Sequence, residues 1–362
     1  MSRKRVIVAM SGGVDSSVAA LLLKEAGYEV SGIYLSLWDT PHSEYQQGYA
    51  GKVCRVLDIP LDIVDLRQEF ARYVVDYFCR EYQQGRTPNP CVACNRHIKL
   101  GSLLGKALAS GADYLATGHY ARIGRSEDGY HLLKASDRSK DQGYFLYTLN
   151  QEKLRHLLFP LGKYTKAEVR KISREGGLPA SDKPSRDLCF VSDKNYRDFL
   201  SRHLPASPGE MVDSRGKIVG HHRGIALYTI GQRHGLGTAS SRPLYVIRIE
   251  PGDNRVMLGD EEELYCQEAA VGEASWTAGT PPAELDGITA KIRYRSTEVP
   301  VTLSLKGESI AAWFPQPQRA VTPGQAIVFY RGDEVLGGGI TESFSPLSPD
   351  KARANPVPAL RS

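Results

Sequence analysis

Short apolar runs alternate with amphipathic stretches along the N-terminal half of the chain. The run at 6–10 leads into a Ser/Gly segment, and the apolar positions at 18–25 recur at helical spacing and stop near Gly27. Further strands are predicted at 29–35, 61–66 and 112–118, and a further helix at 68–81. Because strands that alternate with helices form a parallel sheet with helices on both faces, the pattern predicts an α/β fold.

The pattern changes after residue 204, at a segment rich in Pro, Gly and Ser. Short β-type runs separated by Gly and Asp follow at 216–219, 244–249, 255–258, 290–295 and 326–330. Closely spaced strands of this kind predict small barrels or sandwiches. The predicted domains are a catalytic domain at 1–204, a small β-rich central domain at 205–268, a C-terminal β-barrel domain at 269–346 and a tail at 347–362.

Composition is that of an ordinary soluble protein. No apolar run approaches the roughly 18 residues of a membrane span, and the run after the basic N-terminus ends at Ser11, too early for a signal peptide. We therefore expect a cytoplasmic protein with no membrane contact. Its six cysteines then serve packing, metal binding or catalysis rather than a disulfide scaffold. A net charge of +5 is too small to identify a polyanionic partner, so any nucleic-acid site must be a local patch.

The segment from Ser11 to Ser17 lies between the first predicted strand and the first predicted helix. Its glycines let the backbone approach a ligand closely, and the start of the helix directs amide donors at an anion. A lysine-bearing P-loop is excluded, because no Gly-Lys pair of the chain is followed by Ser or Thr. The segment therefore predicts a phosphate cradle, with the strand end at 117–119 at the same edge of the sheet.

Two other segments carry thiols. Cys91 and Cys94 lie in a proline-rich loop at a spacing that suits a shared metal or redox chemistry. Cys189 stands near Lys183 and Arg186, whose charges would favour its thiolate, although a lone cysteine is often just a small buried apolar residue. Arg86, Arg96, Lys99 and Lys140 would hold backbone phosphates, with solvated surface charge as the alternative for each.

Seven motifs occur in order along nearly the whole chain. They are Ser-Gly-Gly-Val-Asp-Ser-Ser at 11–17, Gly-Arg-Thr-Pro-Asn-Pro-x-x-x-Cys-Asn at 85–95, Ala-Thr-Gly-His-Tyr-Ala at 116–121, Lys-Asp-Gln-x-Tyr-Phe-Leu at 140–146, Tyr-Thr-Ile-Gly-Gln-Arg-x-Gly-Leu-Gly at 228–237, Lys-Ile-Arg-Tyr-Arg at 291–295 and Pro-Gly-Gln-Ala at 323–326. The first resembles the loop of ATP-pyrophosphatases (PP-loop enzymes), which cleave ATP between its α and β phosphates. Together the motifs resemble the tRNA-specific 2-thiouridylases, the MnmA/TrmU family.

The resemblance implies an ATP-dependent tRNA-uridine 2-sulfurtransferase that adenylates the C2 oxygen of the wobble uridine U34 and replaces it with sulfur. Cys94 would be the nucleophile, Cys189 the persulfide carrier and Asp15 a further catalytic residue. ATP, with Mg²⁺, would be held by Ala9, Met10, Ser11, Gly12, Gly13, Val14, Asp15, Ser16, Leu35 and Gly118. Leu35 stands where the family usually has Met, a mild apolar change.

The same resemblance implies the partners. The target base and the anticodon stem-loop of tRNA would contact Asn89, Pro90, Cys91, His119, Lys140, Asp141, Gln142, Arg293, Tyr294 and Gln325. The sulfur would come from a persulfide donor, such as a cysteine desulfurase or a sulfur relay protein.

The chain departs from the family at Cys91, where many members carry aspartate. Three cysteines cannot complete a four-thiolate zinc site, but they can hold a cubane iron–sulfur cluster with one iron left open. We hypothesise that Cys91, Cys94 and Cys189 ligate a [4Fe–4S] cluster. The alternative is a metal-free route in which Cys94 attacks a persulfide on Cys189.

Two other functions are weighed against thiolation. An ATP-dependent ligase or amidase acting on a small molecule would share only the nucleotide loop, and the paired thiols and β-rich C-terminal half fit it poorly. A non-catalytic, metal-containing RNA-binding module would use the cysteines structurally, and the intact Asp15 and Ser16 argue against it.

Overall fold

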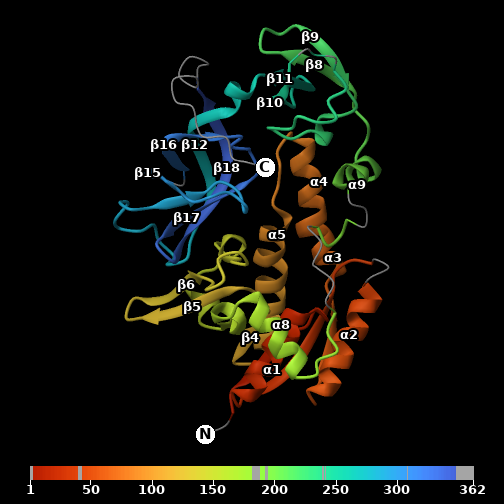
Figure 1. Ribbon diagram of the computed structural model, residues 1–362, viewed down its shortest axis with the longest axis vertical. Coiled ribbons are helices and arrows are strands. Elements are labelled where there is room, and N and C mark those ends of the chain that lie inside the picture. Colours follow the sequence, from red (N-terminus) through yellow and green to blue (C-terminus); the bar gives the residue numbers. More distant parts are fainter. Residues whose placement is uncertain are drawn as a thin grey trace.

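The computed structural model describes residues 3–39, 43–181, 188–191, 195–238, 240, 242–307 and 309–347. These residues form a parallel sheet, a mixed four-stranded sheet and a nine-stranded antiparallel sheet (Figure 1). Within this part of the chain, no helix is long and apolar enough to cross a membrane. Lys183 and Arg186, predicted to activate Cys189, lie outside the described residues, as does the tail beyond Leu347.

The N-terminal sheet has the strand order β3-β2-β1-β4-β7, with every neighbouring pair parallel. Its strands are β1 (Arg5–Ala9), β2 (Glu29–Ser36), β3 (Leu61–Asp65), β4 (Tyr114–Ala116) and β7 (Leu157–Leu158). The chain moves outward from β1 to β3 and then returns to β4 on the other side. The strand order therefore reverses between β1 and β4, and in such sheets a ligand site lies at the carboxyl ends of the strands at this point.

The residues of β1 alternate between two cores, as the period of a strand requires. Val6 and Val8 pack with α1 (Val14–Glu25), α2 (Ser43–Val56) and α8 (Lys166–Glu175), whereas Ile7 and Ala9 face the core that contains α6 (Leu103–Ala109) and α7 (Gln151–Leu154). Both faces of the sheet are thus covered, as the alternating pattern predicted.

Two helical runs contain π-type turns that the sequence pattern did not predict. The predicted helix at 68–81 is a run of α3 (Arg67–Phe70), η1 (Ala71–Val75) and α4 (Asp76–Gln83). After α5 (Pro90–Ala93), a second π-type turn, η2 (Cys94–Ser102), leads into α6. Gly101 permits this wide turn, because a Cβ atom there would lie 2.7 Å from the carbonyl oxygen of Arg96.

The central sheet has the order β10-β11-β8-β9, with β8 (Gly209–Asp213), β9 (Ile218–His222), β10 (Tyr245–Glu250) and β11 (Arg255–Gly259). It follows α9 (Tyr196–His203), whose end coincides with the predicted boundary at 204. The loop between α4 and α5 runs between this sheet and the C-terminal sheet (Figure 1). Gly85 packs on Ile249, and the backbone N–H of Thr87 donates to Pro323 O at 2.8 Å.

The C-terminal sheet contains β12 (Tyr265–Trp276), β13 (Thr289–Lys291), β14 (Val299–Pro300), β15 (Thr302–Lys306), β16 (Ser309–Arg319), β17 (Ala326–Arg331) and β18 (Glu334–Pro346). The predicted boundary between 268 and 269 falls inside β12, so we place it before Tyr265. The predicted strand at 290–295 stops at Lys291, because Ser296 donates its backbone N–H and its hydroxyl to Arg293 O and closes a turn.

A hairpin of the N-terminal half extends the C-terminal sheet. Strands β5 (Ala121–Ser126) and β6 (Gly129–Lys134) pair with each other, and β6 joins β18 through Leu133 and Glu334. The joint core contains Leu132, Val328 and Val335. The N-terminal half of the chain is therefore held to the C-terminal sheet by the pairing of this hairpin, and the two sheets share a common core.

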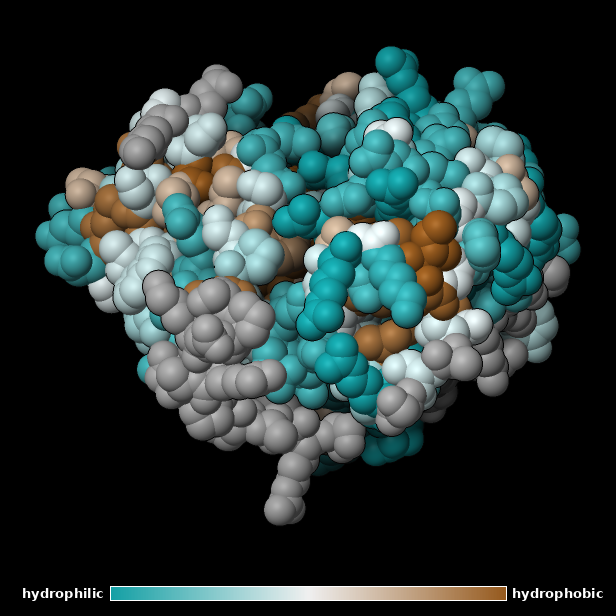
Figure 2. All heavy atoms as spheres, turned by 90° about the horizontal axis from the view of Figure 1, so that it is seen from above, coloured by the Kyte–Doolittle hydropathy of each residue, from teal (hydrophilic) through white to brown (hydrophobic). Residues whose placement is uncertain are grey.

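The end of the molecule that carries the central sheet is mainly hydrophilic (Figure 2). Its hydrophobic residues fall into separate patches rather than one continuous surface. The large hydrophobic side chains exposed among the described residues are Tyr45, Val56, Ile63, Tyr73, Ile218 and Trp313, on different elements. Scattered residues of this kind are normal on a soluble protein and do not indicate a partner.

Candidate active site

The loop between β1 and α1 is held in shape by its own serines. Ser16 Oγ donates to Gly13 O at 3.1 Å and lies 3.2 Å from Ser11 Oγ, while Ser17 Oγ donates to the same carbonyl at 2.8 Å. Gly12 has a φ of +75°, in the left-handed region that favours glycine. The conformation of the predicted phosphate cradle is therefore fixed before any ligand binds.

The loop after β4 touches this cradle. A Cβ atom on Gly118 would lie 2.8 Å from the backbone nitrogen of Ser16, so only glycine fits without displacing α1. Met10 is buried directly below the cradle, and Leu35 lies near the end of the neighbouring strand β2. The predicted ATP-binding residues thus gather at one edge of the sheet, where the strand order reverses.

Asp15 has two partners that the sequence did not reveal. Lys166 Nζ lies 2.6 and 2.7 Å from the two carboxylate oxygens, and the Tyr120 hydroxyl donates to Oδ1 at 2.8 Å. Burial and the charge of Asp15 raise the pKa of Tyr120, so its hydroxyl keeps the proton it donates. Lys166 begins α8 and carries no motif of its own; its link to Asp15 exists only in the folded chain.

The three candidate thiols approach one another around Lys99. Cys94 opens η2 and is buried in the same core as Phe190, the residue after Cys189. Cys91, in α5, keeps exposed surface, and so does Cys189. Each of these sulfurs lies within electrostatic range of the other two and of Lys99.

Burial favours the protonated form of two of these thiols, Cys94 and Cys189. It raises the pKa of Cys94, an effect that Lys99 opposes. Although Cys189 touches solvent, enough protein surrounds it that burial raises the pKa of its thiol to about 12, with Cys94 adding to the rise and Lys99 opposing it. Among the described residues, Lys99 is therefore the cation whose charge favours the thiolate forms of both Cys94 and Cys189.

The same cysteines do not fit a metal site as they are placed. Among the described residues, which include Cys91, Cys94 and Cys189, no three His, Cys, Asp or Glu side chains lie close enough together to hold a metal ion. A [4Fe–4S] cluster needs its cysteine ligands gathered around one cubane. The arrangement therefore favours the metal-free alternative.

Part of the predicted base-binding set lies beside Cys91. Asn89 caps α5 by accepting from the Val92 N–H at 3.3 Å, which fixes the loop, and Pro90 is buried. The ring of Tyr294 lies 4.3 Å from that of Phe145 and 5.9 Å from that of Tyr144. Tyr144 is buried, but the partly exposed rings of Phe145 and Tyr294 offer surfaces of the kind on which an unstacked base is held.

The other predicted tRNA residues differ in their availability. Lys140 is exposed, whereas Asp141 accepts from the backbone N–H groups of Ala135 and Gly143, and Gln142 Oε1 accepts from that of Tyr120. The other two, Arg293 and Gln325, lie in turns beside strands of the C-terminal sheet. Arg293 donates to Arg319 O at 3.2 Å, and the Gln325 carbonyl accepts from the Thr341 N–H. Asp141 and Gln142 thus hold the loop in its conformation through their hydrogen bonds. The side chain of Lys140 is exposed and can contact a polyanion.

Family models match the chain in three consecutive parts. Residues 4–193 match a tRNA methyl transferase HUP domain, 197–260 a tRNA methyl transferase PRC-barrel domain and 266–341 an aminomethyltransferase beta-barrel domain. The tRNA-specific 2-thiouridylase MnmA of Moorella thermoacetica is 47% identical over 360 residues, covering 94% of this chain and 100% of the relative. The chain belongs to the MnmA family. The predicted fold class, a parallel-sheet domain followed by two β-rich domains, is confirmed by the three matches.

Two further similarities were found. The MnmA of Carboxydothermus hydrogenoformans is 46% identical over 359 residues, covering 94% of this chain and 98% of the relative. Among solved structures, the U34-tRNA thiolase NcsA from Methanococcus maripaludis with its [4Fe–4S] cluster is 22% identical. That similarity covers 55% of this chain and 64% of the other, with a TM-score of 0.37.

His119 is a buried neutral histidine. Its Nδ1 lies 2.7 Å from Thr117 Oγ1, and burial together with the charge of Lys99 lowers its pKa to about 3. An unfolded histidine titrates near pH 6.5, so acid favours the unfolded chain, and the stability that His119 contributes is lost as pH falls from about 6.5 towards 3. Between pH 8 and pH 5 this site alone should cost about 2 kcal/mol.

The His119→Gln variant should therefore lose less stability than the parent protein between these two pH values, measured by urea unfolding. The exposed His234→Gln is the control and should behave like the parent. Equal losses in His119→Gln and the parent would contradict a neutral His119.

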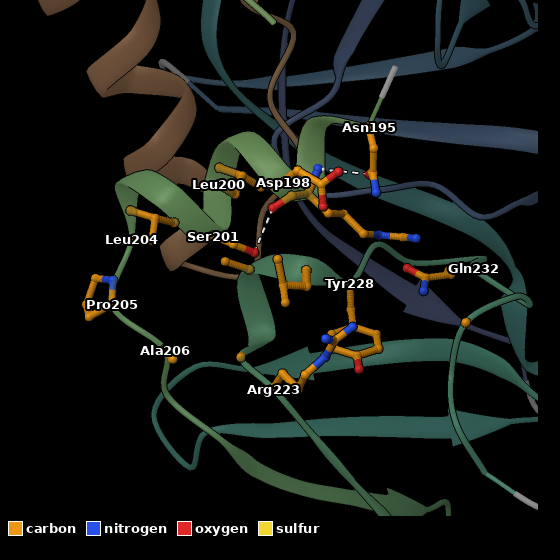
Figure 3. Close-up of a pocket in the computed structure, with 15 residues that line it drawn as sticks. Asn195, Asp198, Leu200, Ser201, Leu204, Pro205, Ala206, Arg223, Tyr228 and Gln232 are labelled. Carbon is orange, nitrogen blue, oxygen red and sulfur yellow. Dashed lines mark hydrogen bonds between the residues drawn. The ribbon is translucent and has the colours of Figure 1, made fainter. Parts of the chain in front are cut away.

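A cavity of about 340 Å³ lies away from all of these residues, between α9 and η5 (Ile225–Leu227) of the central part. Figure 3 shows Arg223, Tyr228 and Gln232 on one side of it and Asn195, Asp198 and Ser201 of the α9 segment on the other. None of the predicted site residues lines this cavity.

Proposed function

We propose that this protein is a tRNA-uridine 2-sulfurtransferase, which uses ATP to convert the wobble uridine U34 of tRNA to 2-thiouridine, releasing AMP and pyrophosphate. One observation carries the proposal most directly. Lys99 lies within electrostatic range of the three thiols and of His119, and His119 follows Gly118, which packs on the nucleotide loop. A sulfur site and an adenylating site thus adjoin each other, in a chain whose relatives are named tRNA-specific 2-thiouridylases.

The first step gives uracil a leaving group. The C2 oxygen of the uridine attacks the α-phosphorus of ATP, the bond to the β-phosphate oxygen breaks, and pyrophosphate leaves with that electron pair. Amides at the start of α1 face the phosphates, and Lys166 places a cation beside them. Mg²⁺ is commonly held by one or two carboxylates together with substrate phosphates, so we expect it to enter with ATP at Asp15.

The second step replaces the oxygen. A donor protein of the cysteine desulfurase or sulfur relay class leaves a persulfide on Cys189. Cys94 attacks the Cys189 sulfur, a Cys94–Cys189 disulfide forms, and the outer sulfur departs as hydrosulfide with the electron pair of the broken S–S bond. Hydrosulfide adds to C2 and AMP leaves, giving 2-thiouridine. An external thiol reductant then restores both cysteines.

The exposure of the two cysteines supports this division of roles. Cys189 is exposed and can react with a donor protein. Cys94 is buried, with 6% of its surface exposed, so it is expected to react with the persulfide on Cys189 rather than with the donor protein. Exposed Lys140 and the aromatic rings beside Cys91 are the proposed contacts of the anticodon stem-loop.

The test combines two measurements on iron-free protein supplied with a persulfide donor. Pyrophosphate release is followed with and without unmodified tRNA, and tRNA nucleosides are analysed by mass spectrometry for 2-thiouridine. We expect release that depends on tRNA, and 2-thiouridine at U34. Release without tRNA would support a small-molecule ligase instead, and no release would support a binding module. Thiolation only after iron is restored would support the cluster.

A further inference from the structure

The π-type turn η2 sets the direction of Lys99. In a regular α-helix, residues five apart point about 140° away from each other, because each residue turns by about 100°. In a π-type turn the hydrogen bonds join residues five apart, as the Leu103 N–H donates to Ile98 O at the end of η2. Cys94 and Lys99 are also five residues apart, so the wide turn stacks them on one face.

The surroundings of Lys99 are sulfurs rather than carboxylates. No Asp or Glu among the described residues forms an ion pair with it, and its electrostatic neighbours are Cys94, Cys91, Cys189 and His119. Burial works to lower the pKa of Lys99, and the three sulfurs, when they are ionised, outweigh burial and raise it. The ammonium group of Lys99 and a thiolate beside it therefore stabilise each other.

This environment differs from the one expected for a phosphate-binding lysine. Phosphate contacts come from cations that reach the surface, and Lys99 is only partly exposed, one helical turn beyond buried Cys94. Arg96, in the same turn, is exposed and lies 3.6 Å from Glu273. Lys99 thus faces inward, towards the sulfurs, while its neighbour faces outward.

We propose that Lys99 is the counter-ion of the sulfur site, whose ammonium group stabilises the Cys94 thiolate as it attacks the persulfide on Cys189 and the hydrosulfide that departs. The step moves one negative charge from Cys94 to the outer sulfur, which is a single S–S bond from Cys189. Both positions lie near the same ammonium group, which stays protonated throughout. The inference rests on the proposed function, because it assigns a residue to its second step.

The test separates the two steps of the reaction. Protein preloaded with persulfide is mixed with ATP and unmodified tRNA, and 2-thiouridine formation and pyrophosphate release are timed in a single turnover. Lys99→Met should slow sulfur transfer by roughly 10- to 100-fold, because a cation is lost from a desolvated site. Pyrophosphate release should stay within about twofold, since the nucleotide loop is untouched.

Two further variants serve as controls, one for the loss of the positive charge at position 99 and one for the loss of a lysine elsewhere. Lys99→Arg keeps the charge and should recover most of the sulfur-transfer rate. Lys106→Met removes an exposed lysine from α6, the next part of the same helical run, and should match the parent in both steps. If circular dichroism shows that Lys99→Met does not fold, Lys99→Gln replaces it in the same comparison.

Three outcomes would overturn the inference: a normal transfer rate in Lys99→Met, an equal loss in Lys99→Arg, or a loss of pyrophosphate release with normal transfer. The last outcome would indicate that Lys99 acts on the nucleotide step, through His119, and not on sulfur transfer. Failure of the proposed function looks different, because the parent protein itself would then release no pyrophosphate in response to tRNA.

Discussion

Replacing Cys189 with serine should reduce 2-thiouridine formation to background while leaving tRNA-dependent pyrophosphate release within about twofold of the parent. A serine hydroxyl cannot carry the outer sulfur of a persulfide, so the second step loses its reagent. The first step depends on the loops after β1 and β4, and neither contains Cys189. Cys94→Ser should show the same separation of the two steps, because the persulfide then has no attacking thiolate.

The two variants should differ in what they accumulate. Cys94→Ser still offers the exposed thiol of Cys189 to a donor, so it should hold a stable persulfide, detectable by mass spectrometry of the intact protein. Cys189→Ser leaves the exposed Cys91 and the buried Cys94 in this group, and it should hold no persulfide on Cys94. A persulfide on Cys94 in that variant would reverse the assigned roles.

Cys91→Asp is the matched control, because it removes the third thiol and leaves Cys94 and Cys189 in place. On the metal-free route it should retain most of the 2-thiouridine formation. If the three cysteines instead held a cluster, loss of one ligand would cost as much activity as Cys94→Ser. The comparison of these two variants therefore decides between the routes without an iron measurement.

The sequence pattern predicted the structural features that depend on neighbouring residues. The strand at 6–10 and the glycines of the nucleotide loop follow from neighbouring residues, and β1 and α1 lie where the pattern placed them. The contact between this loop and Gly118 was also predictable, since parallel strands end at a common edge. The predicted boundary at 268 lies inside β12, whereas the chain passes from the central sheet to the C-terminal sheet between β11 and β12.

Features that depend on distant contacts were not predictable. Lys166 reaches Asp15 across 151 positions of the sequence, and the β5–β6 hairpin joins a sheet formed 200 residues later. Lys99 was assigned to phosphate as one of several basic residues beside the predicted site, and regular helical spacing would turn it away from Cys94. The wide turn η2 reverses that direction, and no periodicity in the sequence signals it.

Gly12→Ala should lower ATP-dependent pyrophosphate release by at least about 100-fold, because it displaces the cradle on which the first step depends. The residue has a φ of +75°, where a side chain costs about 1–2 kcal/mol, and its Cβ atom would lie 2.3 Å from the carbonyl oxygen of Gln46 in α2. Either the loop or the helix must move. Because misplacement by about 1 Å can cost about 100-fold in rate, the nucleotide step should fail even if the chain folds.

Gly48→Ala is the control on the same helix. Gly48 is exposed, and a Cβ atom there would meet nothing within 4 Å, so the variant should keep normal activity and gain up to about 1 kcal/mol of stability from helix propensity. Urea unfolding of both variants shows whether Gly12→Ala is folded when its activity is measured. A folded Gly12→Ala protein with the parent's rate of pyrophosphate release would show that ATP binds elsewhere, and the thiols would then need another source of an activated base.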